Sequence, residues 1–542
     1  MAAPTRQTLR RALARLEDLA SRPGGALVLL VLGVLAYAVQ ALAWPLTTGR
    51  DLDEYLYFWI QLFDRDTLLP WSMLFRTPGT PVVVGPLLDL WGGALAEPVA
   101  ALLYAGSIVA WSAAALAFGA RAALATAVAL LLYPGYALMF HELGSELVMA
   151  AAFAGTALLF VRASARPTVA RFAAVGLAAA FVILVRPGNV VLLALALFPL
   201  ALAAAWRQRL AWAGAFAAAA LVPLAAWTVH NGLRYDHWSL ARGGNAVIPF
   251  YRVFLFDKIV AADNGPESER LADAIEEHLL TREPYRSYGV TLDEIFSAGS
   301  ARVHEDLYTL SDQVFGWDTD YRVLRDAGTE AVEAHPGAYA SGVLDTVWQQ
   351  FSEPYYRVVG SGSGADEAPT TVEVAGETLP APSEGQLIPE GQNLWILRPD
   401  DRIRDVWTSA TERHFVFDRP ADRPRFAEIE RRRDELFAGL PDRHGDATLG
   451  LWLNRASRWY PRLGVWLVVG LVALAWRRPA RWPVPLALAG GATLVVLLNA
   501  LGLGPDPHYA LPVAPGFVLL AAAGLLGPRR SPTVRDDVGH VA

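Results

Sequence analysis

Long apolar runs recur along this 542-residue chain, and they limit its fold more than any other feature. Most are about 18–22 residues long, roughly what a helix needs to cross a hydrocarbon core of about 30 Å. With 54% hydrophobic and only 18% charged residues, the composition does not fit a soluble chain of this length. We predict a polytopic α-helical membrane protein with about ten transmembrane helices. The runs lie near residues 26–47, 96–118, 120–140, 147–161, 169–185, 190–205, 210–229, 463–476, 484–503 and 509–526.

Arginine is concentrated in alternate loops, which predicts the topology. Arginines precede the first run and follow the second, fourth, sixth, eighth and tenth runs. Because basic residues that flank spans stay cytoplasmic, both termini are expected inside and the large polar stretch after the seventh run outside. Lys258 is the only lysine while Arg and Ala abound, a bias typical of GC-rich bacterial genomes. We therefore expect a multi-pass protein of a bacterial plasma membrane.

These signals divide the chain into five parts. A mixed α/β extracytoplasmic domain is expected between helices 7 and 8. The parts are a cytoplasmic N-terminal segment (1–25), a membrane domain with helices 1–7 and catalytic outer loops (26–230), the extracytoplasmic domain (231–461), membrane helices 8–10 (462–527) and a cytoplasmic tail (528–542).

Local patterns predict the elements of the polar domain. Apolar spacing favours a helix at 266–281 and another over 321–352, which should break at His335–Pro336 because the residue before proline resists the α region. Residues 360–366 read as a flexible Gly/Ser linker. Short strands are expected within 371–397, and a charged helix at 424–438.

Composition also excludes some kinds of site and partner. The chain has no cysteine, which excludes disulfides and thiolate metal sites. The net charge of −7 reflects the acidic polar domain, and no basic stripe occurs outside the predicted cytoplasmic loops. This argues against nucleic acid as a partner.

Three carboxylates, Asp51, Asp53 and Glu54, follow the first apolar run directly. The residues after Glu54 are apolar and aromatic through Phe63, which predicts a helix in the membrane interface. Carboxylates beside apolar surface tend to have raised pKa values, which suits a general base. The alternative is a solvated loop with acidic residues at a helix start.

Charged residues also crowd the other short outer loops. His141 and Glu146 bracket a short turn, and Glu146 opens the fourth span, where a charge usually faces a cavity or a partner. Ser145 and Glu146 equally suit a plain helix N-terminus. Arg186 ends the fifth span, where it either snorkels or binds a phosphate with its planar fork. His508 and Tyr509 lie at the mouth of the last span.

The ordered set of these motifs resembles the GT-C glycosyltransferases. The closest in appearance are protein O-mannosyltransferases and the aminoarabinose transferases that modify lipid A. The resemblance covers the membrane portion but not residues 360–450, and His508 stands where that family usually has Arg. The similar segments are Asp53-Glu54 with Tyr55 and Tyr57, Thr77–Pro81 with Gly85–Gly92, Glu146, Arg186-Pro187, His335–Tyr339 and Asp506–Pro512.

The resemblance implies a function and a role for each site residue. A hexosyl or pentosyl group would move from a polyprenyl-phosphate donor to an extracytoplasmic hydroxyl of a glycolipid, cell-envelope glycan or protein, with inversion. A carboxylate would take the acceptor proton, and cations would hold the leaving phosphate. Asp53 would be the base, with Glu54 and Glu146 in support. Donor phosphate or sugar would be bound by Arg186, His508, Tyr509 and His141.

Two other classes of function stay open at this point. A secondary transporter would have a similar number of spans, but it usually shows paired broken helices in two related halves. A non-catalytic, membrane-anchored assembly protein would not need acids and arginines at each short outer turn. No sequence motif requires a cofactor. The sequence leaves open whether a divalent cation is needed.

Overall fold

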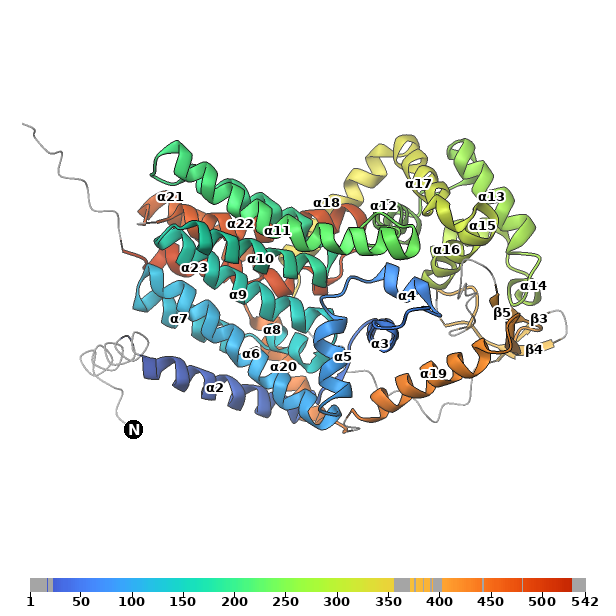
Figure 1. Ribbon diagram of the computed structural model, residues 1–542, viewed down its shortest axis with the longest axis horizontal. Coiled ribbons are helices and arrows are strands. Elements are labelled where there is room, and N and C mark those ends of the chain that lie inside the picture. The colour runs from blue at the N-terminus through green and yellow to red at the C-terminus, as the bar shows by residue number, and fades with distance from the viewer. Residues whose placement is uncertain are drawn as a thin grey trace, which may run out of the picture.

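The computed structural model describes Glu17 and residues 23–354, 371–374, 377–383, 385–389, 392, 402–440, 443–479 and 481–528. The predicted linker at 360–366 and most of both predicted cytoplasmic segments lie outside these residues. Long helices form a bundle at one end of the molecule, and shorter helices and small sheets lie at the other end (Figure 1).

The bundle is built from the predicted apolar runs, and each run contains helix. Among the described residues, six helices are long and apolar enough to cross a membrane, which makes the chain a multi-pass membrane protein. Its helices are α2 (Pro23–Ala41), α6 (Gly93–Ala115), α7 (Ala120–Leu131), α8 (Pro134–Leu138), α9 (Ser145–Ala165), α10 (Val169–Val185), η3 (Pro187–Ala201), α11 (Trp206–Tyr235), α20 (Ala447–Trp459), α21 (Leu463–Arg477), α22 (Pro483–Gly502) and α23 (Pro515–Leu526).

The expected run at 120–140 is not one straight helix. It breaks after α7, and the two halves are bent by 65°. Tyr133 has φ −102° and ψ 92°, outside the helical region, and Pro134 starts α8. The break follows from Pro134, which restricts the residue before it and cannot donate a backbone hydrogen bond. Counting this bent pair as one span gives up to seven, and the runs at 169–185, 190–205 and 509–526 form shorter helices. The total of ten spans stays a prediction.

Small residues let neighbouring membrane helices approach closely. A Cβ at Gly176 of α10 would lie 2.2 Å from the carbonyl oxygen of Phe216 in α11. Gly33 of α2 meets Ala105 of α6 in the same way, at 2.7 Å from the Ala105 Cβ. Helix association in lipid depends on such close packing, since the tails are as apolar as the helices. A larger side chain at either glycine would force the two helices apart.

The polar domain has its own core, formed mainly by α12, α13, α16 and α17. The predicted helix at 266–281 is observed as α13, and the predicted break at His335–Pro336 separates α17 from α18. The helices are α12 (Gly244–Leu255), α13 (Pro266–His278), α14 (Tyr285–Tyr288), α15 (Leu292–Ala298), α16 (Ala301–Phe315), α17 (Arg322–Ala334), α18 (Pro336–Ser352) and α19 (Asp422–Ala438).

Two small antiparallel sheets belong to this domain. The strands expected within 371–397 are present as β3 (Thr371–Val374) and β4 (Glu377–Pro380), paired Thr371 to Pro380. A second hairpin joins β5 (Ile403–Trp407) to β6 (Arg413–Phe417), and the sequence reading missed it. Figure 1 shows both sheets at the far end of the polar domain from the bundle.

Three short helices lie between the bundle and the polar domain: α3 (Leu52–Gln61), α4 (Pro70–Phe75) and α5 (Pro81–Asp89) (Figure 1). The predicted interfacial helix after Glu54 is α3, and α19 packs along it. A short parallel pair joins β1 (Thr47–Thr48) to β2 (Glu142–Leu143). This pairing brings the loop before α3 to the loop before α9.

Arg252 of α12 ties the polar domain to the bundle. Its side chain is only 1% exposed and pairs with Asp257 at 2.9 Å. The same guanidinium donates to the carbonyl oxygens of Ala500 (2.7 Å) and Leu503 (2.9 Å) at the end of α22. These carbonyls are orphaned at a helix C-terminus, so a buried cation satisfies both their hydrogen bonding and the helix dipole.

Candidate active site

The first turn of α3 presents two carboxylates to one arginine. Asp51 caps the helix in a left-handed conformation, φ 59°. Arg76, just after α4, lies 2.5 Å (Nε) from Glu54 Oε2 and 3.0 Å (Nη2) from Asp51 Oδ2. Burial raises the pKa of the Glu54 carboxyl more than Arg76 lowers it, and the nearby charges of Asp51 and Asp53 add to the rise. The expectation of a raised carboxyl pKa in this turn therefore holds for Glu54.

Asp53 lies on a different part of the helix surface. It is half-buried and shares the face of Tyr57, four residues later. The Tyr57 hydroxyl donates to Glu430 of α19 at 2.5 Å and also contacts Arg433. Among the described residues, the side chain of Asp53 in α3 has no hydrogen bond or ion pair. Its carboxylate oxygens are thus free to accept a proton or a hydrogen bond from a ligand.

A second group of interacting side chains surrounds Arg186, the residue that follows α10. Its guanidinium pairs with Glu146, whose side chain is 2% exposed. Its Nε donates to Ser145 Oγ at 2.9 Å, Nη1 reaches the carbonyl oxygen of His508 at 3.4 Å, and the cation lies 5.5 Å from the ring centroid of Tyr509. A buried ion pair needs such extra contacts to offset desolvation. Arg186 is therefore held in place and is not a snorkelling surface arginine.

His508 joins the last predicted outer loop to the turn before α9. Its Nδ1 lies 2.7 Å from Asp506 Oδ1 and its Nε2 lies 3.1 Å from Glu142 Oε2. Burial disfavours the charged imidazole, but the hydrogen bonds to Asp506 and Glu142 outweigh it and raise the pKa of His508 to about 9. With this pKa, the His508 imidazole carries a positive charge at neutral pH.

Arg50 and Tyr55 connect the residues around Arg76 with those around Arg186. Arg50 pairs with Asp506 at 2.8 Å and keeps 52% of its side chain exposed. Tyr55 is buried, and the charges of both Arg76 and Arg186 act on its hydroxyl. We call the whole set the ionic cluster. Its members are Arg50, Asp51, Glu54, Arg76, Glu142, Glu146, Arg186, Asp506 and His508.

His141 occupies a different environment from the other predicted donor-binding residues. Its ring is fully buried and stacks on Tyr37, with centroids 4.0 Å apart and planes 11° apart. Trp44 packs edge-on against the same ring, and the His141 carbonyl accepts from Thr47 at 3.4 Å. His141 thus contacts the β1–β2 pair through its backbone, next to Glu142.

The structure therefore brings together most of the predicted site. Glu54, Glu146, Arg186, His508 and Tyr509 meet at one end of the bundle. Sequence reasoning gave no site role to four members of the ionic cluster. These members are Arg50, Arg76, Glu142 and Asp506.

The cluster offers charges and hydrogen bonds, and its cations are paired with its own carboxylates. Among the described residues, no group of three or more His, Cys, Asp or Glu side chains is arranged to hold a metal ion. Arg186 uses three of its five N–H donors in the contacts above. An anion entering the cluster would meet the remaining donors of Arg186 and the exposed fork of Arg50.

No family model and no curated protein sequence matches this chain. The chain is similar in structure to ArnT of Cupriavidus metallidurans bound to undecaprenyl phosphate, at 15% identity and a TM-score of 0.31, over 93% of this chain and 77% of ArnT. Against ArnT in the apo state the identity is 14% and the TM-score 0.29, over 92% of this chain and 76% of that one.

Proposed function

We propose that this protein is a membrane glycosyltransferase that moves a hexose or pentose from a polyprenyl-phosphate donor to an acceptor hydroxyl. One observation carries the proposal. Arginines and carboxylates from segments far apart in the sequence converge in the ionic cluster, at one end of a bundle whose helices are apolar enough to cross a membrane. Such a place suits a substrate whose tail is lipid and whose head is a sugar phosphate.

The donor phosphate would be held by Arg186 and Arg50. The imidazolium of His508 would add positive charge beside it, because both of its N–H groups already donate to Asp506 and Glu142. Guanidinium groups match phosphate oxygens in a bidentate manner, and preorganised cations stabilise the charge that develops on a leaving phosphate. Arg50 is the most exposed of the three, so it is the readiest to meet an incoming donor. A phosphate monoester is a good leaving group, and no strong general acid is required.

The acceptor proton would go to a carboxylate at the start of α3. Asp53 is the first candidate, because its oxygens carry no ion pair among the described residues. Asp51 is the second candidate. Its charge acts on Arg50, Tyr251 and Tyr509, and the Tyr509 ring lies against Arg186, where the donor phosphate would bind. The Asp51 carboxylate already pairs with Arg76 at 3.0 Å, so one of its oxygens is engaged. Attack by the deprotonated hydroxyl in one displacement would invert the anomeric carbon.

One feature, the bent pair of α7 and α8, favours the transporter alternative. A transporter usually has such a break in each of two related halves. The described residues contain a single bent pair, which does not supply the second half that a transporter usually shows. The convergence of charged residues at one end of the bundle favours the glycosyltransferase.

A transfer assay tests the function directly. The purified protein in nanodiscs would be given radiolabelled polyprenyl-phosphate sugars and a cell-envelope extract, and labelled product and released polyprenyl phosphate would be counted. Wild-type protein and an Arg322→Ala control, altered at an exposed position in α17, should both turn over. Absence of sugar release with every donor sugar would contradict the proposal.

The side of the membrane is tested separately. We propose that the polar domain and the ionic cluster face outward at a bacterial plasma membrane, as the arginine distribution predicts. Reporter fusions at residue 300 should report the extracytoplasmic side, and fusions near 208 and 479 the cytoplasm. A cytoplasmic signal at 300 would overturn this orientation.

A further inference from the structure

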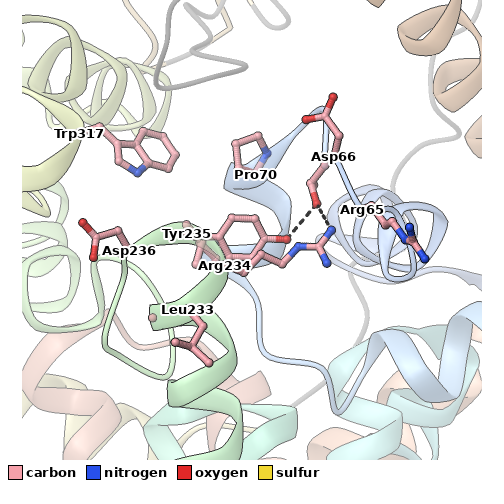
Figure 2. Close-up of a pocket in the computed structure, with 11 residues that line it drawn as sticks. Arg65, Asp66, Pro70, Leu233, Arg234, Tyr235, Asp236 and Trp317 are labelled. Atoms are coloured by element: carbon pink, nitrogen blue, oxygen red, sulfur yellow. Dashed lines mark hydrogen bonds between the residues drawn. The ribbon is translucent and has the colours of Figure 1, made fainter.

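A polar cavity of about 570 Å³ lies between α4 with the loop before it, the end of α11, and Trp317 of the polar domain. Figure 2 shows the Trp317 indole and the Tyr235 ring facing the space next to Pro70. Asp236 lies on the Trp317 side, and Asp66 and Arg65 lie on the opposite side. The volume falls within the range of small-molecule pockets, about 300–1,000 Å³.

The aromatic walls of the cavity are held in place from behind. The guanidinium of Arg242 lies 3.5 Å from the ring centroid of Trp317 and donates to its carbonyl oxygen at 2.6 Å. On the other wall, Thr67 Oγ1 lies 3.0 Å from both the Tyr235 hydroxyl and Nη2 of Arg234. The cavity is therefore preformed and would need little ordering when a ligand binds.

The charges around the cavity are balanced, and this selects a class of ligand. Arg65 and Arg234 supply donors, while Asp66 and Asp236 supply acceptors. Asp66 also pairs with Arg425 at 2.9 Å, and Arg234 donates to Thr67 Oγ1. An apolar ligand would cover these charged groups without hydrogen-bonding to them, and a phosphate would lie against the Asp236 carboxylate. Each hydroxyl of a neutral sugar can donate and accept at once, and the apolar face of the sugar ring can lie on an aromatic ring.

α4 connects this cavity to the ionic cluster. Pro70 and Leu74 line the cavity, and Arg76, two residues beyond Leu74, holds Glu54 and Asp51. Six helical residues span about 9 Å. A short glycan could thus occupy the cavity with its end directed at the carboxylates of α3.

We propose that this cavity is the acceptor subsite and that it binds one or two neutral sugar residues of a glycan. The role of this cavity as an acceptor subsite rests on the proposed transferase function, whereas the binding of sugar does not depend on it. Asp66 and Asp236 would accept hydrogen bonds from sugar hydroxyls, Arg65 and Arg234 would donate to them, and Trp317 would support one ring face.

Ligand binding tests the subsite with the full-length protein in nanodiscs. Saturation-transfer NMR would be recorded with neutral trisaccharides of glucose, mannose and N-acetylglucosamine, and with inorganic phosphate. At least one trisaccharide should bind, and phosphate should not compete with it. Failure of all three trisaccharides to bind, or displacement of a bound one by phosphate, would overturn the proposal.

Substitutions then locate the binding. Arg65→Gln combined with Asp236→Asn changes two exposed side chains, and Asn tolerates the left-handed conformation of Asp236. Trisaccharide affinity should fall at least about tenfold, the effect of losing one hydrogen bond to a charged group. The matched control Arg322→Gln with Asp273→Asn should bind normally. Equal affinity in both double variants would place the glycan elsewhere.

The transfer assay separates this proposal from the proposed function. In an active preparation, the cavity variant should raise the acceptor KM and leave donor binding unchanged. Turnover with an unchanged acceptor KM would reject the subsite while keeping the transferase. Trisaccharide binding that the cavity variant weakens, in a protein that releases sugar from no donor, would reject the transferase while keeping the glycan site.

Discussion

Arg186 and Glu146 form a buried ion pair between the end of α10 and the start of α9. The two side chains pair across the two helices. The guanidinium of Arg186 also contacts Ser145, the ring of Tyr509 and the carbonyl oxygen of His508. The pair has a structural use, since it joins two membrane helices to the last loop. It also fixes the direction of the guanidinium donors that remain.

Substitution of Arg186 tests its use in donor binding. Arg186→Ala should weaken binding of a polyprenyl phosphate more than Arg186→Lys, because lysine keeps the charge but loses the planar fork. Binding would be measured by isothermal titration in nanodiscs. Since Ala also leaves Glu146 unpaired, the double variant Arg186→Ala with Glu146→Gln provides the stability control. Wild-type donor affinity in both single variants would limit Arg186 to helix packing.

The pH dependence of donor binding should report on His508. Its pKa is raised to about 9 from the ordinary value of 6.5, so the folded protein holds the proton more tightly than the unfolded chain. The stability and the phosphate affinity that depend on the imidazolium should be fully present below pH 6.5 and should be lost as pH rises through about 9. His508→Gln should remove this step from a pH titration of donor binding. A wild-type titration with a midpoint near 6.5 would show that Asp506 and Glu142 do not hold the proton.

Removal of Arg252 should destabilise the folded protein. Arg252→Ala leaves Asp257 and two carbonyl oxygens of α22 unpaired, and loss of one partner from a buried pair costs about 3–5 kcal/mol. Thermal unfolding followed by tryptophan fluorescence should show a clear drop in Tm, while Arg322→Ala should be neutral. Replacing both Arg252 and Asp257 by Leu should cost less than Arg252→Ala, because no charge is left unpaired. A Tm for Arg252→Ala equal to wild type would mean that Arg252 does not hold the domain to the bundle.

Local sequence signals predicted the elements that depend on local physics. Apolar length marked the membrane helices, and the proline rule placed the end of α17 at His335. The same rule applied to Pro134 would have found the break after α7, but the apolar run there was read as continuous. The β5–β6 hairpin was missed because its first strand, Ile403–Trp407, carries charged residues between the apolar ones.

The candidate site was predicted in its residues but not in its pairings. Glu146 and Arg186 were singled out separately, since each places a charge at the end of an apolar helix. Their mutual contact, and that of His508 with Glu142, joins residues 40 and 366 positions apart. Such contacts depend on which helices become neighbours, and no local pattern encodes that. Arg76 shows the same limit, because only the position of α4 brings it to Glu54.

The choice of general base is decided by matched substitutions at the start of α3. If Asp53 removes the acceptor proton, Asp53→Asn should lower the transfer rate by about 10²–10⁴-fold while donor binding survives. Glu54→Gln should cost less, because Glu54 already pairs with Arg76. Asp51→Asn keeps the left-handed cap and should also cost less, unless Asp51 is the base. The pH profile supplies a second readout, since the variant that lacks the base should lose the rise in rate with pH at the acidic limb. Normal rates in Asp53→Asn together with a large loss in Asp51→Asn would move the base to Asp51, and normal rates in both would remove it from α3 altogether.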